Sequence, residues 1–252
     1  MSDKPHHDDS PGELLASMTA LRRRTRADRN AYWFPLVLFG LLTVAAAPLY
    51  VESTEPAGMR ALPEDSHPLA ALGGDFLERS AALGWYWLVA LVAGYLLSLG
   101  WYHWRGERMG LRTPTRAYRT AGAVGLLVGL LLPVTMSFLT SNTDASVSEV
   151  TSWLTNPVLG VANRGMLPHL VIALGLLVLA RLERSLGLLV VALFFTAAVV
   201  SVNLWFHLTE FKPGDLSRWS FLLAAVPPAA ILLVGGATAL FASRTARAGR
   251  PA

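Results

Sequence analysis

Long apolar runs separated by short charged stretches dominate the pattern along this chain of 252 residues. We identify six hydrophobic segments, at positions 31–51, 81–104, 117–140, 158–180, 185–207 and 219–243. Each is about twenty residues long, the length that lets a helix cross a ~30 Å hydrocarbon core at ~1.5 Å per residue. The pattern predicts an all-α fold, a polytopic membrane bundle of six transmembrane helices.

If the six segments cross the membrane in turn, the basic residues fall mainly on one side of it. With the N-terminus in the cytoplasm, 16 of the 21 Lys and Arg residues lie in or beside the inner segments, which are 1–30, 105–116, 181–184 and 244–252. The outer side then receives Arg60, Arg79, Arg164, Lys212 and Arg218. Because Lys and Arg in short flanks stay cytoplasmic, the distribution predicts both termini inside, with outer loops at 52–80 and 141–157.

Composition supports the membrane class and removes other classes. The chain is 53% hydrophobic and 15% charged, whereas a soluble domain is about one quarter charged. Its net charge of +4 comes from arginines at membrane edges, so we expect no nucleic-acid partner. With no cysteine there is no thiolate nucleophile and no thiolate metal site, and we expect neither a metal nor a cofactor.

The predicted cytoplasmic tail, 1–30, carries a helix signal. Ser10 and Glu13 have capping-box spacing, and they are followed by apolar residues on one helical face and then by a run of arginines. One interpretation is an amphipathic helix along the inner leaflet, with its arginines at anionic headgroups. The other is a short solvated helix or a disordered tail. The opposite end, 244–252, is a second basic cytoplasmic tail.

Catalytic signals are missing from the segments. No Asp or Glu lies within any of the six, although proton-coupled transporters and intramembrane metalloproteases normally require a carboxylate at depth. The sequence also contains no HExxH, no GxSxG and no phosphate-binding glycine loop. We therefore expect no catalytic residue, and a membrane enzyme that uses the outer histidines is the least favoured class.

Four polar residues gather toward the predicted outer leaflet: Arg164, His169, Asn203 and His207. The short charged turn between the fourth and fifth segments makes those helices adjacent and antiparallel, so the four lie at similar depth. His169 is expected to bond Asn203 or a carbonyl freed by Pro168, and Arg164 to extend to the outer surface. The group is either interhelical bonding or an outward-facing ligand pocket.

Small residues repeat every four positions in two segments. They are Ala90, Gly94 and Ser98 in the second segment, and Ala121, Gly125 and Gly129 in the third. Such stripes let helix backbones approach closely in lipid. We expect them to serve packing inside the bundle; contacts in a homo-oligomer are the alternative, and the oligomeric state stays open.

Three stretches carry a resemblance. "AYWFPLVLFGLL", "GWYWLVALVAGYLL" and "GLLVLARLERS" resemble segments of six-span integral membrane proteins of actinobacteria, and the likeness extends over most of the first five segments. The resemblance implies a multi-pass protein of a bacterial plasma membrane and supplies no activity and no catalytic residue.

A weaker likeness is to the permease subunits of ABC-2 type exporters, which are similar in length, keep the N-terminus inside and begin with an interfacial helix, as 11–27 would. This chain departs from them because its longest outer loop follows the first segment. The expected role is an accessory or partner subunit of a membrane transport or signalling system. The alternative is a permease that binds an ATPase at the inner loop 105–116.

Overall fold

The computed structural model describes residues 32–51, 70–74, 77–108, 161, 164–208 and 222–248, and positions 12, 120, 122–125, 127 and 131. The third hydrophobic segment, the tail 1–30 and the loops 52–80 and 141–157 lie largely outside these residues. So do the last residues of the tail 244–252. The described positions of the third segment are helical.

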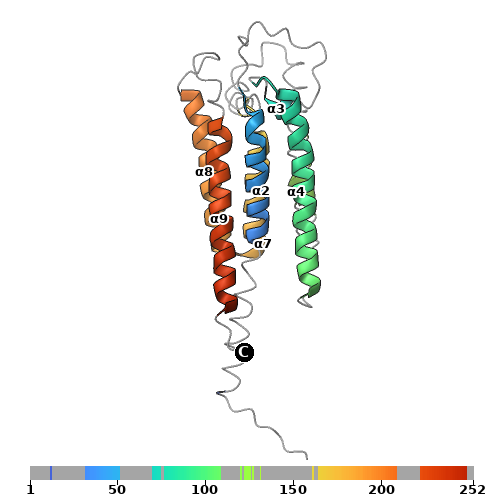
Figure 1. Cartoon of the computed structure of the whole chain (residues 1–252), viewed down its shortest axis with the longest axis vertical. Coiled ribbons are helices and arrows are strands. Elements are labelled where there is room, and N and C mark those ends of the chain that lie inside the picture. The colour runs from blue at the N-terminus through green and yellow to red at the C-terminus, as the bar shows by residue number, and fades with distance from the viewer. Residues whose placement is uncertain are drawn as a thin grey trace, which may run out of the picture.

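Seven helical elements follow one another along the described chain. They are α2 (Trp33–Ala46), η2 (Ala47–Leu49), α3 (Ala70–Gly73), α4 (Ser80–Arg108), α7 (Leu167–Glu183), α8 (Leu186–Leu208) and α9 (Leu222–Ala248). The five longer helices run along a common axis, and the short α3 lies beside the start of α4 (Figure 1). The all-α class is thus confirmed for the described residues.

Three of these helices, α4, α8 and α9, are long and apolar enough to cross a membrane, and α2 with η2 forms a shorter apolar helix. Large apolar side chains such as Phe194, Val234 and Phe241 point out of the bundle. A surface of this kind suits lipid rather than water, because soluble proteins rarely expose contiguous apolar patches. The fold is that of a membrane protein.

The start of α7 is set by local chemistry. Gly165 has a φ of 65°, a region that glycine enters without a steric penalty, and Pro168 stands in the first helical turn, where its missing N–H is not needed. The helix therefore begins at Leu167, well after the apolar run begins near position 158.

The turn between α7 and α8 is as tight as the sequence predicts. Arg184 ends α7 in the left-handed conformation with φ 50°, and α8 begins at Leu186. The Leu188 amide donates to the Ser185 Oγ at 3.4 Å, which satisfies one amide of the new helix. The two helices are consequently antiparallel neighbours.

Glycines bring the central helices together. α2 packs most extensively against α9, where Gly236 lies so close to α2 that an added Cβ would stand 2.6 Å from the Val37 side chain. Likewise, a Cβ added to Gly235 would stand 2.7 Å from the Val191 side chain of α8. Between these contacts the interior is filled by fully buried side chains, namely Leu36, Leu188, Phe195 and Leu232.

Candidate functional site

A fully buried histidine lies at the start of α7. Three aromatic rings surround His169: Trp87 of α4, Tyr50 after η2, and Phe195 of α8, with centroids 5.3, 6.2 and 6.4 Å from the imidazole. We call these four residues the histidine cage. It joins four segments of the chain at one end of the bundle.

A short hydrogen-bond chain fixes the cage. The Trp87 indole Nε1 donates to the Tyr50 hydroxyl at 3.2 Å, and that hydroxyl donates to the Gly165 carbonyl at 2.8 Å. Gly165 must be a glycine here for a second reason, because a Cβ would meet the Gly73 carbonyl oxygen at 2.8 Å. The residues beside α3 thus close over the turn that precedes α7.

The imidazole does not form the bonds predicted for it. His169 Nδ1 and Nε2 have no hydrogen-bond partner among the described residues, so the expected bond to Asn203 or to a carbonyl freed by Pro168 is wrong. The reason is direction, since the ring points among the rings of Tyr50 and Trp87. Leaving a buried polar group unsatisfied costs about 1–3 kcal/mol.

Arg164 and Asn203 do meet. Arg164 Nη1 donates to Asn203 Oδ1 at 2.6 Å and lies 3.5 Å from the Asn203 carbonyl oxygen, and the guanidinium stands 5.6 Å from the Phe206 ring. The arginine is half-buried and turns onto α8, and its predicted extension to the outer surface stays a prediction. The His207 side chain lies outside the described residues.

The small-residue stripe of α4 faces the interior. Ala90, Gly94 and Ser98 are buried, and a Cβ on Gly94 would stand 2.8 Å from the Phe39 ring of α2. Among the described residues, nothing lies within 4 Å of a Cβ added to Gly125 of the second stripe. Ala121 and Gly129 lie outside the described part of the chain.

The opposite end of the bundle holds a polar contact that sequence reasoning missed. The Tyr102 hydroxyl of α4 donates to Glu183 Oε1 at the end of α7, while Oε2 is buried with no partner in the described chain. Burial raises the pKa of the Glu183 carboxyl from its ordinary value of 4.5 to about 7, against the opposing effects of the Tyr102 bond and of Arg105. We call this contact the Tyr102–Glu183 tie.

A sequence signal for the tie exists in helical spacing. Glu183 follows the buried Leu176 and Ala180 by seven and three positions, so all three share one face of α7. Because Glu183 stands among charged residues, the sequence suggested an exposed turn, and the burial of the Glu183 carboxyl was not predicted.

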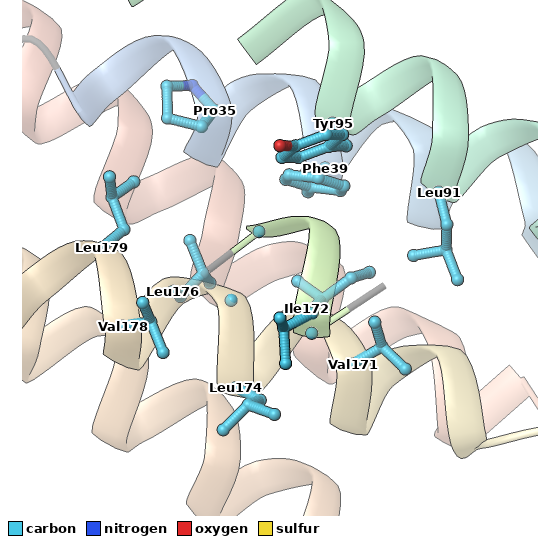
Figure 2. A pocket seen from close by; sticks show the side chains of 14 residues that line it. Pro35, Phe39, Leu91, Tyr95, Val171, Ile172, Leu174, Leu176, Val178 and Leu179 are labelled. Atoms are coloured by element: carbon cyan, nitrogen blue, oxygen red, sulfur yellow. The ribbon is translucent and has the colours of Figure 1, made fainter. Parts of the chain in front are cut away.

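Between these two ends lies an apolar cavity of about 320 Å³. Phe39 of α2 and Leu91 and Tyr95 of α4 face the side chains of α7, including Ile172 and Leu176, across it (Figure 2). Along α4 the lining lies between Trp87 and Tyr102, and along α7 between His169 and Glu183. The cavity is therefore bounded by the histidine cage at one end and by the Tyr102–Glu183 tie at the other.

The sequence matches no protein-family model, and neither a curated protein nor a solved structure matches it. Within the described ranges no group of three or more His, Cys, Asp or Glu residues could hold a metal ion. What the arrangement offers chemically is a buried imidazole, a half-buried guanidinium held by an amide, and a carboxyl that exchanges a proton near neutral pH.

Proposed function

We propose that the chain is a six-span protein of a bacterial plasma membrane, with both termini in the cytoplasm. We further propose that it is an accessory or partner subunit of a membrane transport or signalling system. It acts through lateral contacts of its helices and through the outer loops 52–80 and 141–157.

One observation carries the accessory role: the interior between α2, α7, α8 and α9 is closed. Leu36, Leu188, Phe195 and Leu232 are fully buried there, which supports a packed interior rather than a transport path between these four described helices. The apolar groups that remain accessible lie on the outside, on the helix faces that contact lipid or another membrane helix.

The proposed threading is supported by the two ends of the bundle. The end with Arg105 and Arg108 in the last turn of α4 is the end where α7 turns into α8 past Arg181 and Arg184. Arginines therefore gather at the end assigned to the cytoplasm, as the charge distribution requires.

A permease that binds an ATPase is the alternative. It is favoured by the exposed last turn of α4, where Glu107 and Arg108 stand free of the bundle at the start of the basic segment 105–116. Such a helix end is accessible to a cytoplasmic subunit.

Purification of the tagged chain from its native membrane in mild detergent tests the choice. We expect an associated membrane protein and no stimulated ATP hydrolysis. An Arg105→Ala, Arg108→Ala variant is the matched control, because it removes charge from the inner loop and leaves the helix faces intact. A nucleotide-binding subunit that co-purifies with the parent chain, and is lost from this variant, would refute the accessory role and establish the permease.

A further inference from the structure

α7 packs mainly against α8 and only lightly against α4. Along their middle the cavity, which Gly122, Val124 and Gly125 of the third hydrophobic segment also line, lies between α4 and α7, and the direct side-chain contacts described between the pair are at its ends. One end is closed by the ring contact of Trp87 with His169, and the other by the Tyr102–Glu183 tie. The tie therefore controls how far the two helices stand apart at its end.

The carboxyl in the tie is poorly suited to carry a charge. Tyr102 satisfies Oε1, whereas Oε2 is buried without a partner in the described chain. An ionised carboxylate has about four acceptor sites, while the protonated acid is neutral and can be buried at far smaller cost. The joined arrangement of the helices consequently favours the protonated acid.

Among the described residues, the other charged groups at this end are mainly arginines. α4 presents Tyr102 and Arg105 to the carboxyl, and the exposed Arg181 and Arg184 belong to the same turn as Glu183. The first turns of α8, from Leu186, carry no titratable side chain, and Tyr32 before α2 lies against Gly187. At the end of α9, Arg244 is exposed.

We propose that Glu183 is a proton-binding site through which the pH at this face of the membrane determines whether α4 and α7 stay joined over the apolar cavity. The protonated acid keeps the tie buried. The ionised carboxylate moves toward water and Arg105, the tie separates, and the cavity opens at that end. That this pH is the cytoplasmic one rests on the proposed topology.

The sign follows from burial. Because folding raises the pKa of Glu183 from 4.5 to about 7, the joined arrangement binds the proton more tightly than an open one. The tie is complete at low pH and is lost as the pH rises through about 7.

The test uses the full chain in nanodiscs, where buffer reaches both membrane faces, so its outcome does not depend on which face is cytoplasmic. Since the chain has no cysteine, Glu107→Cys and Leu182→Cys place two spin labels at exposed positions of α4 and α7. Dipolar EPR measures their separation from pH 5.5 to pH 8.5, and infrared spectroscopy follows the band of the protonated carboxyl.

We expect the separation to increase with a midpoint near pH 7, as the infrared band disappears. The isosteric Glu183→Gln variant should stay joined throughout and lack the band. Tyr102→Phe removes the donor of the tie, so its separation should already be wide at pH 5.5 and should change little with pH. Glu78→Gln, an exposed carboxyl at the other end, should change nothing. A separation that is constant with pH, or that changes equally in Glu183→Gln, overturns the proposal.

Discussion

At the scale of single residues, His169 stands out because its burial is complete and its hydrogen bonding is not. It packs edge-on against Trp87 at 5.3 Å, an arrangement that rings of this kind favour. His169 therefore contributes to the fold as a ring that fills space, while its two nitrogens, which have no described partner, lower the stability of the fold. Phenylalanine would keep the first property and remove the second.

We expect His169→Phe to stabilise the protein by about 1–2 kcal/mol, because it removes buried polar atoms that have no described partner. Thermal unfolding in detergent, followed by tryptophan fluorescence, measures the change. His169→Ala is the control and should destabilise, since it empties the cage. A loss of stability in the phenylalanine variant would mean that the imidazole nitrogens are in fact bonded, and that the cage holds a polar occupant.

At the residue scale, the tight turn in the sequence predicted that α7 lies beside α8, but the bond of Arg164 to Asn203 was not predicted. The direction of the His169 ring could not be predicted, because it depends on Tyr50 and Trp87, which are far away in the sequence. The Tyr102–Glu183 tie could not be predicted for the same reason, since 81 positions separate the two residues.

At the scale of elements, close approach of backbones replaces the hydrophobic effect as the means of joining helices. Gly236 touches α2 with no room for a Cβ, whereas a Cβ on Gly175 of α7 would have no described atom within 4 Å. Hydrophobic runs in the sequence predicted where these helices lie, and the repeat at Ala90 predicted one packing face. Which glycines touch a neighbour depends on how each helix is rotated, and periodicity alone does not determine rotation.

The two glycines give a matched test with opposite expected signs. Gly236→Ala should destabilise by about 1–3 kcal/mol, because the new Cβ meets Val37 of α2, including its backbone nitrogen at 3.0 Å. Gly175→Ala should be neutral or stabilise by up to about 1 kcal/mol, through helix propensity alone. Chemical unfolding of both variants in mixed micelles compares them. Equal effects would show that the α2–α9 contact is looser than described.

At the scale of the whole molecule, α4 runs the length of the bundle. Glu78 lies just before its first residue and Glu107 lies in its last turn, so the two mark opposite ends of the molecule. Both are exposed acidic residues in a chain without cysteine, and they make an equivalent pair of reporter positions. Gly73, by contrast, is unsuitable, because a side chain there would collide with the Ser80 carbonyl.

Labelling of Glu78→Cys and Glu107→Cys with a membrane-impermeant maleimide in intact cells tests the proposed threading. We expect the first to react and the second to react only after the membrane is permeabilised, because the proposed threading places the arginine-rich Glu107 end inside. The reverse pattern would invert the topology without affecting the packing described for the helices.

The chain from Trp87 through Tyr50 to Gly165 also has a consequence for how the protein is made. The Tyr50 hydroxyl finds its acceptor 115 positions later in the sequence. At about 5–20 residues per second, a ribosome takes on the order of ten seconds to cover that stretch. During that interval the first two helices have an incomplete polar end, which the emergence of Gly165 completes before α9, the main packing partner of α2, is made.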